Sequence, residues 1–229
     1  LDLKYTVKVR GNGNGVVVSV DLDKPLPAKF TGKLGFMLEL FPGWLYGKTW
    51  YLDNASGIFP RQPNGPAMKD PKGEVVANMP MAVGKKLSVA PEDNLLHLTI
   101  ESAKGELQLL DGRYVHNNGW FVVRSVIPEN STKNAVEWII TPGVVPGRKS
   151  APVVHVSQVG YLPGQEKVAI IELDKKDTKR EVATLVRIDA DGEQVPAGSF
   201  RGDDWGQFLR YNYVKVDFTS ARQEGMYFI

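Results

Sequence analysis

The stretch "VHVSQVGYLPGQEKVAII", residues 154–171, decides how the second half of this 229-residue chain is expected to fold. Two apolar runs flank a Gly-Tyr-Leu-Pro-Gly turn, a pattern typical of a β-hairpin or of the opening of a small sandwich domain. Gly160 can adopt a positive φ and Pro163 fixes the exit of the turn, so the two set the register. Gln158 and Tyr161 can offer polar groups to the turn's unpaired amides and carbonyls. Because turn chemistry accounts for these residues, we interpret the motif as structural.

Similar runs recur along most of the chain. Short β-branched and aromatic segments bounded by Gly, Asn, Asp and Pro are typical of half-buried strands. Examples are "LKYTVKV" at 3–9, "GVVVSVDL" at 15–22, "KLGFMLEL" at 33–40 and "AVEWIITP" at 135–142. Residues 178–188 fit a helical period as well as alternation, and we interpret them as a strand before an Asp-Gly turn. The sequence therefore predicts an all-β fold.

A change in composition marks a domain boundary at "PGVVPGRKSAP", residues 142–152, where prolines and glycines disfavour both sheet and helix. The prediction is two tandem β-sandwich domains. Residues 1–148 form the first, with a long, less regular, aromatic-rich insertion at 42–94. Residues 152–229 form an immunoglobulin-like sandwich.

The charge balance and the cysteine content exclude several classes of function. The chain has 28 basic and 26 acidic residues mixed along its length, a net charge of +2, which argues against a nucleic-acid partner. It has no cysteine, and hence no disulfide, thiol nucleophile or thiolate metal site. No apolar run approaches the roughly 20 residues that span a bilayer. The chain begins without a leader and stops in the apolar "EGMYFI", so we expect a processed piece truncated in its last strand.

The quoted stretch resembles the opening of the immunoglobulin-like module that precedes the catalytic barrel in many family 9 glycoside hydrolases. The residues that fit this opening are Val154, Val156, Gln158, Gly160, Tyr161 and Pro163. Ser157 stands where asparagine is usual in that family. The segment "VKVDFTSARQEGMYFI", residues 214–229, is similar to the end of the module, through Asp217, Phe218, Thr219, Gly225 and Tyr227.

The first half is similar, more loosely, to the sandwich that precedes this module in some enzymes of that family. The resemblance implies a non-catalytic accessory region of a cellulase-type or β-glucanase-type enzyme, secreted or in the cell envelope. Its partners would be the catalytic barrel of the same polypeptide and plant cell-wall polysaccharide. The barrel's acidic catalytic stretches do not occur in this sequence, so the chain is not expected to be an enzyme itself. The alternative is a free-standing carbohydrate-binding or cell-surface adhesion protein.

Other catalytic candidates are weak. Asp203 and Asp204 are an adjacent carboxylate pair, but the two face opposite ways in a strand and are more typical of a solvated turn with Trp205. His97, His116 and His155 lack the spacing of a metal site, and no cofactor or metal is predicted.

The aromatic insertion is the stretch with most capacity for binding. Aromatic rings cover the apolar face of a sugar, while carboxylate, amide and guanidinium groups bond its hydroxyls. The candidate carbohydrate-binding residues are Trp44, Tyr46, Trp50, Tyr51, Asp53, Arg61 and Gln62. The alternative is that these aromatics pack the sandwich core. Arg113, Tyr114 and His116 extend this binding face or tie down a loop.

Overall fold

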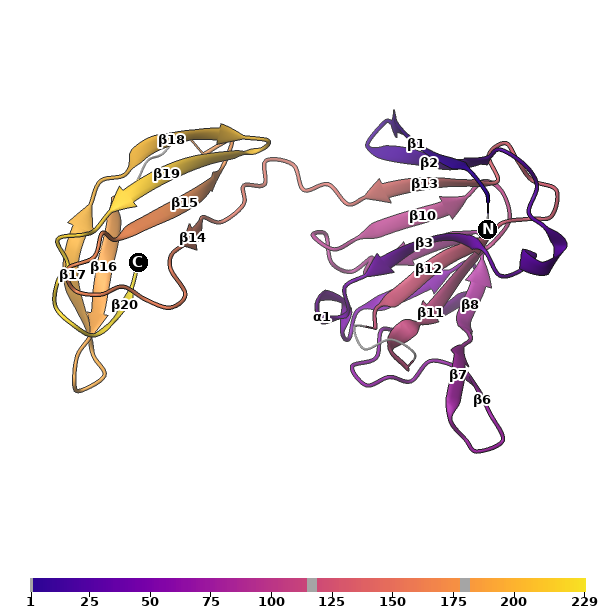
Figure 1. Ribbon diagram of the computed structural model, residues 1–229, viewed down its shortest axis with the longest axis horizontal. Coiled ribbons are helices and arrows are strands. Elements are labelled where there is room, and N and C mark those ends of the chain that lie inside the picture. The colour runs from indigo at the N-terminus through magenta and orange to yellow at the C-terminus, as the bar shows by residue number, and fades with distance from the viewer. Residues whose placement is uncertain (1, 115–118, 178–181) are drawn as a thin grey trace. The chain divides into compact units, whose positions relative to one another are not determined.

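The computed structural model (Figure 1) describes residues 2–114, 119–177 and 182–229 and is nearly all β. The chain divides into two compact units, Leu1–Pro146 and Gly147–Ile229. Each unit contains two main sheets, and both are β-sandwiches. The all-β prediction is confirmed.

The first unit contains a seven-stranded sheet in the order β1-β2-β13-β10-β9-β4-β5 and a four-stranded sheet in the order β3-β12-β11-β8. The strands of the larger sheet are β1 (Tyr5–Asn12), β2 (Gly15–Leu22), β13 (Val136–Pro142), β10 (Leu98–Ser102), β9 (Lys86–Val89), β4 (Thr49–Leu52) and β5 (Ala55–Ile58). Those of the smaller sheet are β3 (Gly35–Leu40), β12 (Phe121–Val126), β11 (Leu107–Asp111) and β8 (Pro80–Gly84). A two-stranded hairpin, β6 (Ala67–Lys69) with β7 (Val75–Asn78), stands apart from both.

Trp138 of β13 joins the two sheets of the first unit. It is completely buried, and its ring meets Phe36 of β3 edge-on at 5.0 Å between centroids. Its Nε1 donates a hydrogen bond of 2.9 Å to Ser125 Oγ of β12. A large indole whose single polar group is satisfied suits a sandwich core.

The segment 42–94 has more regular secondary structure than the irregular insertion that the sequence predicts. It contains the one-turn helix α1 (Pro42–Leu45), and it supplies β4, β5 and β9 to the larger sheet and β8 to the smaller one. Alternation in β4 turns Trp50 and Leu52 inward, where both are buried, and leaves Tyr51 exposed. Two 3₁₀ turns, η1 (Ala28–Phe30) and η2 (Gly112–Tyr114), are the other helical elements of the described residues.

The second unit pairs a four-stranded sheet, β14-β15-β19-β18, with a three-stranded sheet, β17-β16-β20. The strands are β14 (Val153–His155), β15 (Val168–Asp174), β16 (Ala183–Ile188), β17 (Gln194–Phe200), β18 (Asp203–Phe208), β19 (Tyr211–Asp217) and β20 (Met226–Phe228). Side chains from both sheets meet in a small core that includes Ala169, Leu185 and Val216. The unit is immunoglobulin-like.

The hairpin predicted from residues 154–171 is present. β14 pairs antiparallel with β15, with Val154 opposite Ile171, and the loop between them spans residues 156–167. Gly160 has φ +80°, as predicted.

One local prediction is wrong. Asp203 and Asp204 lie in β18 rather than in a turn, because they pair with Lys215 and Val214 of β19. The strand predicted within 178–188 is confirmed as β16 from Ala183 to Ile188, and residues 178–181 lie outside the described residues.

Candidate functional site

The seven candidate carbohydrate-binding residues do not form one surface. Trp50 is 6% exposed and belongs to the core, so its indole is not available to stack on a sugar ring. Tyr51 is exposed on the outer face of the seven-stranded sheet, where it pairs with Ser56 and Ser88. Trp44 is in α1, which follows β3 of the other sheet. The three aromatics are close in sequence, but alternation in β4 turns Trp50 and Tyr51 to opposite faces, and Trp44 lies in another element.

The Trp44 ring is accessible to a ligand. It is 67% exposed, and its ring meets Phe41 edge-on at 5.4 Å between centroids. Phe41 also contacts the half-buried Trp120, at 5.2 Å. Carbohydrate binding at Trp44 stays a prediction.

Arg113 holds the loop that carries Arg61 and Gln62. Its guanidinium donates hydrogen bonds to the main-chain carbonyl oxygens of Pro60 and Arg61, both at 2.8 Å, and to that of Gln62 at 3.2 Å. Tyr114 adds a 2.6 Å bond from its hydroxyl to the carbonyl oxygen of Pro63. Of the two roles left open for Arg113 and Tyr114, the structure shows the tying of a loop; His116 lies outside the described residues.

The same guanidinium forms a buried ion pair with Asp111. Arg113 Nε lies 2.7 Å from Asp111 Oδ1, and the Asp111 side chain is completely buried. Burial opposes the charge on Asp111, but hydrogen bonds from Arg113 and from the backbone amides of Asn64 and Arg113 outweigh it and lower the pKa of this carboxyl. The pair anchors the loop, and its carboxylate has no capacity left for a ligand.

Tyr46 and Asp53 also have structural roles. The half-buried Tyr46 ring lies beneath two guanidinium groups, those of Arg113 at 5.5 Å and Arg61 at 5.9 Å. Asp53 adopts φ +50° in the β4–β5 turn, and its carboxylate accepts hydrogen bonds from the amides of Lys85 and Lys86.

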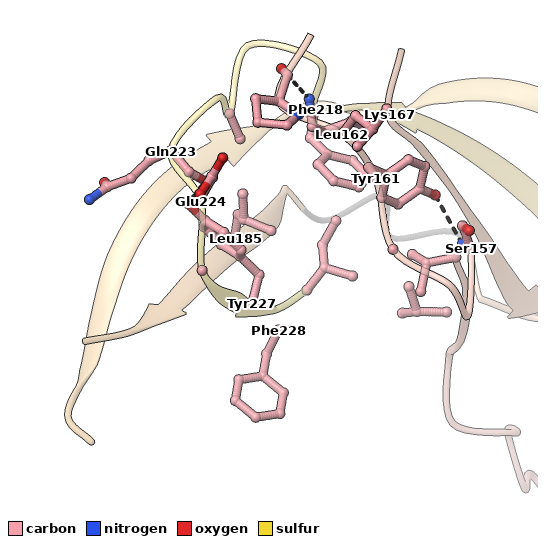
Figure 2. Close-up of a pocket in the computed structure, with 17 residues that line it drawn as sticks. Ser157, Tyr161, Leu162, Lys167, Leu185, Phe218, Gln223, Glu224, Tyr227 and Phe228 are labelled. Atoms are coloured by element: carbon pink, nitrogen blue, oxygen red, sulfur yellow. Dashed lines mark hydrogen bonds between the residues drawn. The ribbon is translucent and has the colours of Figure 1, made fainter. Parts of the chain in front are cut away.

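The second unit contains a hollow of about 620 Å³. It lies between β14 and β20, which are edge strands of the two sheets. Figure 2 shows Tyr161, Leu162 and Phe218 together at one end of the hollow, with Tyr227 and Phe228 at the other. The hollow is therefore an opening in the side of the sandwich, lined mainly by apolar side chains.

Most of the residues that carry the resemblance line this hollow. The Tyr161 hydroxyl accepts a 3.0 Å bond from the Ser157 amide and donates a 2.7 Å bond to the Val168 carbonyl oxygen (Figure 2 shows the first). Its ring meets buried Phe218 edge-on at 5.4 Å. Gly160, Pro163, Gly225 and Tyr227 also line the hollow. Asp217 instead caps the turn after β19 by accepting the Thr219 amide at 2.8 Å, and Gln158 is exposed.

Lys167 is a buried cation at the edge of the hollow. It is 6% exposed, and its ammonium donates hydrogen bonds to the carbonyl oxygens of Pro163, at 2.9 Å, and Gln165, at 3.1 Å. These bonds fix the loop between β14 and β15, as the Arg113 bonds fix a loop of the first unit.

The structure also reveals an aromatic group that sequence reasoning missed. Trp205 and Phe208 of β18 lie beside Tyr213 and Tyr211 of β19. The composition of "RGDDWGQF" favours a turn, and local sequence therefore does not show this arrangement. The alternation of Tyr211, Tyr213 and Lys215 was the signal that could have revealed it.

Neither a metal-ligand cluster nor a membrane-spanning helix is found in the described residues. Across residues 2–114, 119–177 and 182–229, no three His, Asp or Glu side chains gather in a way that could hold a metal ion. The helices found in this part of the chain are too short to cross a bilayer.

The fold defines a nearly all-β, tandem β-sandwich protein whose second unit is immunoglobulin-like. Residues 149–229 match the family described as the cellulase N-terminal ig-like domain, so this unit is similar to a cellulase-associated module. The match covers about a third of the chain and leaves the first unit outside it. No curated protein and no solved structure matches the chain.

Proposed function

We propose that this chain is a non-catalytic accessory region of a polysaccharide-degrading glycoside hydrolase of cellulase or β-glucanase type. The observation that supports this most is the similarity of residues 149–229 to the cellulase N-terminal ig-like domain. The enzyme would belong to family 9, as the resemblance of the hairpin and of the end of the chain implies. A secreted or cell-envelope location follows from a polysaccharide substrate outside the cell.

The hollow is consistent with a role of the second unit in stabilising a catalytic barrel. An apolar opening between two edge strands leaves apolar side chains of its rim, and the outer backbone groups of an edge strand, open to a partner. Leu162, on its rim, is 73% exposed, and Phe228 is 54% exposed. We propose that an apolar segment of the catalytic barrel packs here, because burial of these two side chains would stabilise both parts.

The alternative function is a free-standing carbohydrate-binding or adhesion protein. It predicts that no catalytic barrel shares the polypeptide and that the hollow stays open in the native protein. The chemistry of Trp44 is compatible with either function.

The test is to read the gene on both sides of residues 1–229, to express the whole polypeptide and to assay it on barley β-glucan and hydroxyethylcellulose. We expect hydrolysis, and a lower inactivation temperature when residues 149–229 are deleted. A polypeptide that lacks a catalytic barrel would contradict the proposal and favour the adhesion protein.

A further inference from the structure

The outer face of the four-stranded sheet in the second unit carries a group of aromatic side chains that belongs to neither the core nor the hollow. We call it the aromatic face and define it by Trp205 and Phe208 of β18 and Tyr211 and Tyr213 of β19. Residues Val214 and Val216 of β19 are buried in the core, so by alternation Tyr211, Tyr213 and Lys215 point outward. Phe208 pairs with Tyr211 and therefore shares that side of the sheet.

These rings are accessible. Trp205 is 61% exposed and Phe208 is 65% exposed, and every residue of β18 is exposed. The pairing of β18 with β19 shifts between Asp204 and Gly206, which places Trp205 in an irregularity at the sheet edge. Its ring meets Tyr213 edge-on at 6.3 Å, so Tyr213 supports the indole without covering it.

Polar groups continue the face beyond the rings. The Tyr213 hydroxyl donates a 3.1 Å hydrogen bond to Glu172 Oε2 of β15. Lys215 stands next along β19, opposite Asp203 of β18. Aromatic rings thus lie at the edge of the sheet, with a carboxylate and an ammonium group further in.

We infer that the aromatic face binds an uncharged, extended glycan chain. Exposed rings suit the C–H face of pyranose rings, and the flanking Glu172 and Lys215 suit their hydroxyl groups. Acidic and basic groups alternate across this face, as Lys215 and Asp203 do, so it offers no stripe of one charge to a polyanion. The choice of a β-linked glucan as ligand rests on the proposed function.

Binding to this face would complement the role of the hollow. The hollow lies between β14 and β20, whereas β18 is the opposite edge of the sheet that contains β14. A catalytic barrel in the hollow and a glycan on the aromatic face would therefore contact different edges of the same unit.

The experiment is affinity gel electrophoresis of this chain in hydroxyethylcellulose, barley mixed-linkage β-glucan and xyloglucan, followed by calorimetry with the best ligand. The variants are Trp205→Ala, Tyr213→Phe, Trp44→Ala as a probe of the candidate site in the first unit, and Tyr5→Ala as a matched exposed aromatic control, 68% exposed in the first unit. We expect retardation of the parent, a loss of at least about tenfold in affinity for Trp205→Ala, a smaller loss for Tyr213→Phe and no change for Tyr5→Ala. Circular dichroism should show unchanged folding, because Trp205 is exposed.

Three results would overturn the inference. One is a parent chain that none of the three glycans retards. Another is affinity lost in Trp44→Ala but kept in Trp205→Ala, which would place the glycan on the first unit. The third is a dimer in sedimentation that Trp205→Ala converts to a monomer without glycan binding, which would make the face a protein interface. None of them decides the accessory role, because that role is tested by the activity and stability of the whole polypeptide.

Discussion

The two units differ in how completely they enclose their cores. In the first unit, the cluster around Trp138 includes residues of both sheets that are completely buried, such as Leu87 and Phe121. In the second unit the buried cluster is small, and its members Leu185 and Phe218 also line the hollow. The difference teaches that similar sandwich architecture can give one unit with an enclosed core and one whose core borders an open apolar hollow.

The largest expected effect is on the enclosed core. Trp138→Ala should destabilise the first unit by about 4 kcal/mol, because it removes a buried indole and leaves a cavity between the sheets. Urea unfolding followed by circular dichroism measures it, with Trp44→Ala as the exposed control, expected to change stability by less than about 0.5 kcal/mol. Equal effects of the two substitutions would contradict the enclosed core.

The next effect concerns the anchored loop of the first unit. Arg113→Leu should cost about 3 kcal/mol, because buried Asp111 loses its ion-pair partner and three carbonyls lose a donor. The double variant Asp111→Leu with Arg113→Leu should recover part of this loss in the same unfolding assay. If the double variant loses as much stability as the two single variants added together, the pair is not coupled.

Acid should lower the stability of the first unit more than that of the second. The pKa of Asp21 is lowered by hydrogen bonds from Lys8 and the Asn134 amide, and that of Asp111 is also lowered. A carboxyl whose pKa is lower folded than unfolded stabilises above its unfolded pKa, near about 3.9, and the stabilisation is lost as the pH falls below it. Glu92 and Asp93 of the first unit also have lowered pKa values. In the second unit the pKa is lowered for Asp174, by the amides of Ser150 and Lys176, and for the exposed Asp217, by Thr219.

Calorimetric scans between pH 7 and pH 3 should therefore show the first unit's transition falling faster below about pH 4. Asp21→Asn removes one of these carboxylates and should flatten that decline. If the melting temperature of Asp21→Asn falls with pH as steeply as that of the parent, Asp21 does not contribute to the decline.

The smallest effect is on the hairpin loop of the second unit. Tyr161→Phe removes the hydroxyl that accepts from Ser157 and donates to Val168, and it should cost about 1 kcal/mol of the second unit's stability. The first unit's transition in the same scan is the internal control. A change in both transitions would mean that the two units do not unfold independently.

Local chemistry is enough to predict the hairpin and most of the strands, with β18 as an exception. Gly160 adopts the positive φ that its turn requires, and Tyr161 bonds the loop backbone, because both roles depend on neighbours in sequence. The role of Trp50 could not be predicted in this way. Whether it faces inward depends on the pairing of β4 with β9, which lies more than thirty residues away.

The hollow and the aromatic face could not be predicted either, because they depend on contacts between segments that are not adjacent in the sequence. The hollow forms because Val154 and Phe228, at opposite ends of the second unit, line the same space. The local sequence favours a turn at Trp205, because Asp203, Asp204 and Gly206 are typical turn residues. Only the pairing with β19 shows that this stretch is an exposed edge strand.

The most direct test of the account is to compare Leu162→Asp in this chain and in the whole polypeptide by differential scanning calorimetry. Leu162 is exposed on the rim of the hollow, and Val159, 99% exposed and outside the hollow's lining, serves as the matched control through Val159→Asp. If a catalytic barrel covers the hollow, Leu162→Asp should lower the melting temperature of the whole polypeptide by several degrees and leave this chain almost unchanged, while Val159→Asp changes neither. An equal, negligible effect of Leu162→Asp in both proteins would show that nothing packs in the hollow and would contradict the accessory role proposed for it.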